Sequence, residues 1–261
     1  MNKIKILLCF IFLIYASQNI VVFSKEANVS TASETGDTFD ENDDFDDFDD
    51  FDDEFNGKDL QQSFDPFMVY NRCMFQINDK LYHIILKPMA VIYNKIIPTP
   101  VRFSIQKFFN NITFPARLIN NLLQGKFKNA SIECGRFLIN STIGILGFFD
   151  PAKSKFHLLA KKEDFGQTLG YYGIKEGIPL VLPFYGFSNL RDALGRIPDY
   201  LLNPVSFVRP EMRRMLIIAG DKMNYISLNS KEYDNLKSDA LDEYTFLKYL
   251  YQKDRRNKIE E

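Results

Sequence analysis

The sequence has no tryptophan, only two histidines and only three cysteines among its 261 residues. His83 and His157 stand far apart and form no spaced pair of the kind that holds a catalytic metal. The chain also lacks a Cys-x-x-Cys pair, a Gly-x-Ser-x-Gly nucleophile turn and a glycine-rich loop for phosphates. We therefore expect no enzyme, no bound metal and no cofactor.

Beyond its first residues the chain also lacks an apolar run long enough to cross a bilayer. The N-terminus carries Lys3 and Lys5, followed by an apolar run over residues 6–15. A positive start, an apolar core and small residues after it are typical of a secretory signal peptide, which we place at residues 1–24. Cleavage near Ala16 and a retained anchor are the alternatives. We expect an exported protein.

The three cysteines are Cys9, Cys73 and Cys134. Cys9 lies inside the apolar run without the small residue that precedes a lipid-attachment cysteine, so we do not expect lipidation there. After export, Cys73 and Cys134 would meet an oxidising compartment, where a bridge between them would contribute about 4 kcal/mol. Two buried free thiols are the alternative, because sequence alone gives no distance that decides between them.

Residues 25–63 are predicted to form a disordered acidic linker. Residues 43–53 alternate two aspartates with one phenylalanine, a three-residue repeat that fits neither a helix nor a strand. Such dense like charge favours an extended spacer, and a docking segment with aromatic anchors for a basic partner is the alternative.

The charge of the chain is divided between its two parts. Of 32 basic and 34 acidic residues, 4 and 15 precede Phe64, so the remainder carries 28 and 19 and a net charge of about +9. A basic exported body points to anionic lipid head groups or an acidic protein face rather than to nucleic acid.

From residue 64 onward the pattern is mainly helical. After Pro100, apolar residues at helical spacing predict a first amphipathic helix with the face Val101, Ile105, Phe108, Phe109 and Ile112. A second face comprises Met212, Met215, Leu216, Ala219, Met223 and Ile226. The last segment has Leu241, Tyr244, Leu247 and Leu250, and its charged residues 253–256 are typical of a solvated helix end. We predict a helical domain at residues 64–210 and a helical extension with a solvated tail at 211–261.

Two apolar stretches rich in glycine or proline interrupt the helices, at residues 143–149 and 178–187. Neither is long enough to span a bilayer, and buried core is the expectation for each. The four-residue spacing of Pro179 and Pro183 excludes a regular helix in the second stretch. A buried turn, a short edge strand or a loop inserted into lipid are its possible forms.

Several motifs follow one another along the body. They are Phe64-Asp65-Pro66, Asn71-Arg72, Leu123-Gln124-Gly125, residues 136–144, Asp150-Pro151-Ala152, residues 163–170, residues 182–186 and Leu190-Arg191-Asp192. In this order and spacing they resemble the VacJ/MlaA family over about residues 64–204.

That resemblance implies a mainly α, ring-like domain in the inner leaflet of the outer membrane, at its periplasmic face. An amphipathic channel through the ring would take mislocalised phospholipids from the outer leaflet and pass them to a periplasmic carrier, which maintains lipid asymmetry. The family resemblance also implies a trimeric outer-membrane porin as a partner. Family members are commonly lipoproteins, and the environment of Cys9 departs from that pattern.

A lipid channel needs apolar walls for acyl chains and polar groups for head groups. Within the family motifs, Arg136, Asn140 and Arg191 are candidates for a polar lining. Candidates for an apolar rim are Leu182, Pro183 and Phe184. A structural ion pair between Arg191 and Asp192, and a helix cap at Asn140, are the alternatives.

Other motif residues are expected to act structurally: Asp164, Phe165, Gly166, Thr168, Gly170 and Asp192. Capping is the favoured interpretation for the adjacent carboxylates Glu163 and Asp164, because neighbouring residues on a helix point apart. Glycines such as Gly166 and Gly170 permit tight turns and close helix approach.

Two other functions compete with lipid transport. A structural envelope protein would use its basic body to bind a porin or a cell-wall polymer without moving lipid. An enzyme acting on phospholipids is disfavoured, because no nucleophile stands beside a base in the sequence.

Overall fold

The computed structural model describes residues 65–238 and 240–260. The predicted signal peptide and acidic linker lie outside these described residues. The chain begins with α4 (Met68–Leu81), η2 (Tyr82–Leu86), α5 (Lys87–Ile96), α6 (Thr99–Ile112), α7 (Phe114–Leu123), α8 (Phe127–Thr142) and α9 (Pro151–Ser154). It continues with α10 (Phe165–Tyr171), β1 (Pro179–Leu182), β2 (Gly186–Asn189), α11 (Leu190–Leu202), η3 (Pro204–Phe207), α12 (Glu211–Ser238) and α13 (Glu243–Glu260).

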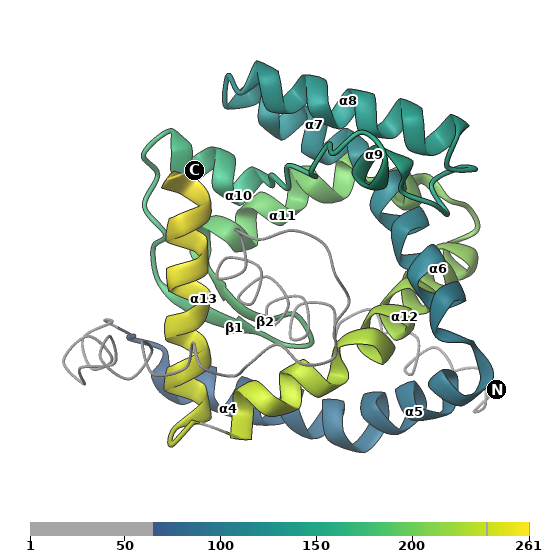
Figure 1. The fold of residues 1–261 in the computed structure, drawn as a ribbon. Helices are drawn as coiled ribbons and strands as arrows, with labels where there is room; N and C mark the ends of the chain where they lie inside the picture. Colours follow the sequence, from purple (N-terminus) through teal and green to yellow (C-terminus); the bar gives the residue numbers. More distant parts are fainter. Residues whose placement is uncertain (1–64, 239, 261) are drawn as a thin grey trace, which may run out of the picture.

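These helices are arranged as a ring (Figure 1). α4 and α5 form one side, α6 the next, α7 and α8 the third, and α10, α11 and α13 the fourth. α12 packs against α5 and α6. The predicted mainly helical, ring-like class is therefore confirmed.

Both predicted amphipathic helices are present. α6 begins at Thr99 with Pro100 in its first turn, where the missing N–H of proline costs nothing. α12 places Ala219, Met223 and Ile226 against Tyr82, Leu86 and Ala90 of η2 and α5, which makes one hydrophobic core. The 3.6-residue period of the apolar residues therefore predicted both helices, α6 and α12.

A second core joins the two ends of the described chain. Phe75 of α4 packs with Val181 and Phe187 of the hairpin and with Tyr244 and Leu247 of α13. The Phe75 and Phe187 ring centroids lie 5.6 Å apart. Because α4 and α13 meet on one hairpin, this cluster closes the ring.

The second apolar stretch forms an antiparallel hairpin of β1 and β2, in which Leu182 pairs with Gly186. Two buried asparagines seven residues apart on α4 hold its edge. Asn71 donates to Pro179 O (3.0 Å) and accepts from Val181 N (2.8 Å). Asn78 likewise donates to Leu182 O (3.0 Å) and accepts from Phe184 N (2.6 Å). The two amides substitute for a third strand, which satisfies edge groups that burial would otherwise leave unpaired.

The first apolar stretch corrects an expectation. Residues 143–149 form a turn after α8 whose apolar side chains face outward: Ile143, Ile145, Leu146 and Phe149 are each more than half exposed. Gly147 has φ +92°, and a Cβ there would lie 2.5 Å from Cβ of Asn111. The prediction of buried core was wrong because tight local packing of this turn leaves its larger side chains outside.

The C-terminal end of the chain differs from the expected solvated tail. α13 continues to Glu260, and Asp254 and Arg255 are buried rather than solvated. The prediction of a solvated tail was therefore wrong for these residues.

Both expectations for the cysteines were also wrong. Cys73 on α4 and Cys134 on α8 are free and exposed, so they form neither a disulfide bridge nor buried thiols. Figure 1 places α4 and α8 on opposite sides of the ring.

Candidate functional site

A cavity of about 280 Å³ lies between α6, the hairpin turn, α11 and α12. Its lining combines apolar and polar side chains: Phe109, Thr113, Tyr185, Arg196, Asp199, Tyr200, Asn203, Val205, Ser206, Ile217, Ile218, Asp221 and Lys222. Such a mixture suits a ligand that has both an apolar and a polar part.

α11 builds the polar side of this cavity. Arg196 and Asp199 are three residues apart on α11, and Asn203, the residue that caps its C-terminal end, follows four residues later, so all three line the cavity from the same side. The other face is apolar and exposed, with Leu190, Leu194, Ile197 and Leu201 between 45% and 60% accessible. α11 is therefore polar toward the cavity and apolar outward, the reverse of a helix on a water-soluble protein.

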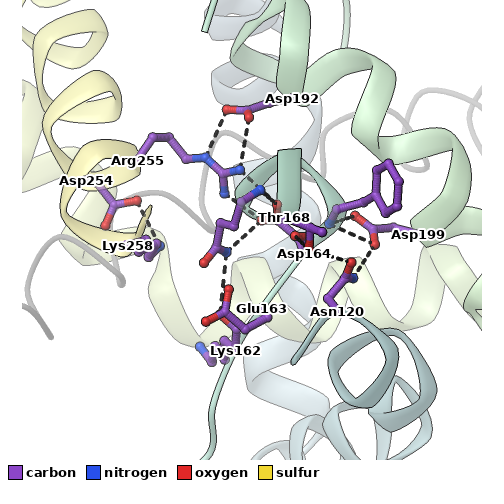
Figure 2. A network of polar contacts seen from close by, with 12 residues as sticks. Asn120, Lys162, Glu163, Asp164, Thr168, Asp192, Asp199, Asp254, Arg255 and Lys258 are labelled. Carbon is purple, nitrogen blue, oxygen red and sulfur yellow. Dashed lines mark hydrogen bonds and ion pairs between the residues drawn. The ribbon is translucent and has the colours of Figure 1, made fainter. Parts of the chain in front are cut away.

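A network of charges beside the cavity ties α10, α11 and α13 together (Figure 2). Arg255 of α13 donates to Asp164 through Nη1 (2.5 Å) and Nη2 (2.8 Å). The same guanidinium donates to Asp192 Oδ1 (3.0 Å), and its Nε lies 2.9 Å from Asp192 Oδ2. One arginine thus holds two carboxylates from two other helices.

This arrangement keeps both carboxylates charged. Burial alone would raise their pKa values, but the guanidinium of Arg255 and hydrogen bonds lower the pKa of Asp164 and of Asp192 below the usual range. Asp164 also caps α10 by accepting from Gln167 N (2.8 Å), which confirms the predicted cap. Asp192 accepts from the hydroxyl of Tyr251 (2.7 Å).

Asp199 connects the network to the cavity. Its carboxylate accepts from Phe165 N (3.0 and 3.2 Å) and from Asn120 Nδ2 (2.9 Å). Thr168 donates its hydroxyl to the same amide, Asn120 Oδ1, at 2.9 Å. Burial, and next the nearby charge of Asp164, raise the pKa of Asp199 to about 6. The pKa of this carboxyl group is therefore raised, whereas the pKa values of Asp164 and Asp192 are lowered.

Close contact of α10 and α11 makes the network possible. A Cβ on Gly195 would lie 2.6 Å from the backbone nitrogen of Gly166. A Cβ on Gly166 would lie 2.5 Å from Asp192 Oδ1 and 2.7 Å from Arg255 Nη2. The two glycines therefore let the helices cross with their backbones in contact, and leave room for the ion pairs.

The sequence-predicted polar residues lie in two places. Arg136 pairs with Asp150 (2.8 Å), and buried Asn140 donates to the other oxygen of Asp150 (2.9 Å). Arg191 is buried and its Nε lies 3.0 Å from Asp192 Oδ1, which is the ion pair considered as an alternative. All three are held by carboxylates, and none lines the cavity described above.

The predicted apolar rim residues lie together at the tip of the hairpin. Leu182 ends β1, while Pro183 and Phe184 form the turn, with φ +67° at Phe184. Tyr185, the next residue, lines the cavity. In Figure 1 the hairpin extends from the α13 side toward the opening of the ring. Their role at a channel stays a prediction.

Sequence reasoning missed Arg196, Asp199, Lys222 and Arg255. The sequence did contain a pattern for the first two. Polar residues recur at helical spacings of four and three, at Asp192, Arg196 and Asp199, between apolar residues, which predicts a polar helix face. No local pattern marked Arg255, whose partners are 91 and 63 residues away.

The family model described as MlaA lipoprotein matches residues 63–258. The chain belongs to the MlaA family. The match runs through α12 and α13, so the predicted boundary at residue 210 falls inside the family's range. The resemblance inferred from the ordered motifs is confirmed.

Curated proteins, among them two named MlaA, are similar along much of this chain. An Escherichia coli K12 protein named "Intermembrane phospholipid transport system lipoprotein MlaA" is 36% identical, over 55% of this chain and 59% of that protein. A Shigella flexneri protein of the same name is 35% identical, over 59% and 62%. An uncharacterized Rickettsia typhi protein is 32% identical, over 76% and 78%.

A solved MlaA-like structure, described as the structural basis for maintenance of bacterial outer membrane lipid asymmetry, superposes with a TM-score of 0.64. It is 30% identical, and the alignment covers 76% of this chain and all of that one. Within residues 65–238 and 240–260, no helix combines the length and apolar character needed to cross a membrane.

Proposed function

We propose that this protein transports phospholipids between the membranes of a bacterial envelope. It would remove mislocalised phospholipids from the outer leaflet of the outer membrane and pass them to a periplasmic carrier, thereby maintaining lipid asymmetry. The observation that carries this proposal is the reversed amphipathicity of α11, with polar residues toward a cavity and apolar residues outward. The protein's membership of the MlaA family and the names of its relatives support the same function.

The reversed helix is what a lipid-embedded ring requires. Exposed leucines cost free energy in water but gain it against acyl chains, at about 25 cal/mol per Å². α8 and its following turn carry further exposed apolar residues: Phe127, Leu138, Ile143, Ile145 and Leu146. We therefore place the ring at the periplasmic face of the outer membrane, in its inner leaflet. A trimeric porin as its partner rests on the family resemblance alone.

Inside the ring, the cavity would give a phospholipid a route that avoids exposing its head group to hydrocarbon. Phe109, Ile217 and Ile218 would contact the apolar part, while the α11 side chains would contact the head group. The protein would then remove water from the phospholipid and let it pass, without making or breaking a covalent bond.

The test uses two neighbouring positions on α12. Ile217 lines the cavity, whereas Leu216 is 53% exposed. In a diderm bacterium lacking its own family member, we expect wild type and Leu216→Trp to lower outer-leaflet phospholipid. Ile217→Trp should leave it high at equal abundance in the outer membrane, because the indole fills the cavity.

An Ile217→Trp variant as active as wild type would reject this cavity as the route. If wild-type protein reached the outer membrane and outer-leaflet phospholipid stayed high, transport itself would be rejected. The alternative of a structural protein that binds a porin or cell-wall polymer would then be favoured.

A further inference from the structure

Arg196 is a cation that has no counter-ion among the residues that the structure describes. Its side chain is partly buried on the cavity face of α11, with the guanidinium carbon 5.2 Å from the centre of the Tyr185 ring. Among the residues that the structure describes, no carboxylate lies in ion-pair distance of it, and its Nη1 is buried with no hydrogen-bond partner. The neighbouring arginines Arg191 and Arg255, by contrast, are both held by Asp192.

A buried guanidinium donor that lacks an acceptor is costly. Desolvating a charged group without a partner costs several kcal/mol, and an aromatic face returns only about 0.5–2 kcal/mol. Native structures keep few such groups, and an unsatisfied donor that lines a cavity is suited to bind a ligand. A ligand group that binds it must accept hydrogen bonds and should carry negative charge, because the guanidinium donates, never accepts and is always charged.

A second cation lines the same cavity from α12. Lys222 forms an ion pair with Asp221, the adjacent residue in the chain, at 3.7 Å. The lining also contains two carboxyl groups, Asp199 and Asp221, and burial raises the pKa of each. The cavity therefore has cations on two elements, and among the described residues Lys222 has a carboxylate within ion-pair distance whereas Arg196 has none.

We propose that Arg196 and Lys222 form a phosphate site, which binds the phosphodiester of a phospholipid as it passes through the ring. This inference rests on the proposed transport function and adds to it the group that the cavity recognises. Guanidinium and phosphate oxygens make paired, charge-assisted hydrogen bonds, which fit the fork geometry of Arg196. Phe109, Ile217 and Ile218 lie in the same lining and would receive the adjoining acyl carbons.

The proposal predicts discrimination between two lipids that differ only in the head group. The probes are a short-chain phosphatidylglycerol and the diacylglycerol with the same chains, titrated into the full-length protein in detergent and followed by calorimetry. Wild type should bind the phospholipid more tightly. Arg196→Gln should weaken phospholipid binding by about tenfold or more and leave diacylglycerol binding unchanged.

Controls separate charge at this site from charge in general. Arg213→Gln removes an exposed arginine of α12 that does not line the cavity, and should bind both lipids as wild type does. Arg196→Lys should retain part of the preference, because it keeps the charge but not the fork. If Arg196→Gln fails to fold, judged by circular dichroism, Lys222→Gln provides the same comparison.

The contrary results differ from those that reject transport. Equal affinity of wild type for the two lipids, or an Arg196→Gln variant with unchanged preference, would overturn the phosphate site while lipid binding stands. Inorganic phosphate that binds as tightly as the phospholipid would assign the cations to free phosphate and overturn the proposal. Failure to bind either lipid would reject both the site and the transport function.

Discussion

Arg255 is the residue on which most long-range contacts of this site converge. Its guanidinium pairs with Asp164 and Asp192, which lie at two other helices and are themselves partly or fully buried. A buried ion pair adds little net stability over an apolar pair, but removal of one partner leaves an uncompensated charge. Asp164 also caps α10, so a change in its surroundings would weaken the start of that helix as well as the contact between helices.

We predict that Arg255→Leu lowers the free energy of unfolding by about 3–5 kcal/mol, because Asp164 loses its counter-ion and Asp192 keeps only Arg191. The matched control is Arg256→Leu, since Arg256 is exposed and should change stability by less than about 0.5 kcal/mol. Urea unfolding followed by circular dichroism measures both. Equal stability of the two variants would show that the network is not structural.

At the scale of elements, buried asparagines determine how the irregular segments attach to helices. Asn71 and Asn78 hold the hairpin, Asn140 accepts from the backbone of Ala152, and Asn120 connects Thr168 with Asp199. An amide both donates and accepts, so one side chain can satisfy two backbone groups of a loop. A hydrophobic pattern does not predict these residues, because they are polar side chains at buried helix positions where the helical period predicts apolar ones.

The crossing of α10 and α11 gives the prediction at this scale. Gly195→Ala should destabilise the protein by about 1–3 kcal/mol, because the new Cβ would lie 2.6 Å from Gly166 N and 2.9 Å from its Cα. Gly220→Ala on α12 is the control: no atom lies within 4 Å of its Cβ, so it should stabilise by about 0.5–1 kcal/mol.

Thermal unfolding distinguishes the two substitutions by sign. If Gly195→Ala were also stabilising, the helices would have room to separate, and the close crossing would not be needed for the ion pairs beside it.

At the scale of the whole molecule, stability should have a maximum in mildly acidic solution. The lowered pKa values of Asp164 and Asp192 contribute stability that is present above about pH 4 and lost as the pH falls. The pKa of Asp199, raised to about 6, has the opposite sign: the folded state binds its proton more tightly than the unfolded state. Stability should therefore fall as the pH rises from about 4 to about 6.

The contribution of Asp199 to that fall is at most about 3 kcal/mol. Asp199→Asn should reduce the loss between pH 4 and 7, because the amide oxygen still accepts from Phe165 N and carries no charge. Melting temperatures measured across this range test the prediction, and an unchanged pH dependence in the variant would contradict it.

The sequence by itself determined the helical class, the two amphipathic helices α6 and α12, the cap at Asp164 and the family. These follow from local periodicity, from proline placement and from ordered motifs, all of which act within a few turns of the chain. Only the tertiary structure decided that Arg255 is buried, that the apolar side chains of residues 143–149 face outward and that Arg196 has no counter-ion among the described residues. The physical reason is that burial and charge pairing depend on which distant helices meet, and a ring gives one helix a polar inner face and an apolar outer face that sequence periodicity alone cannot orient.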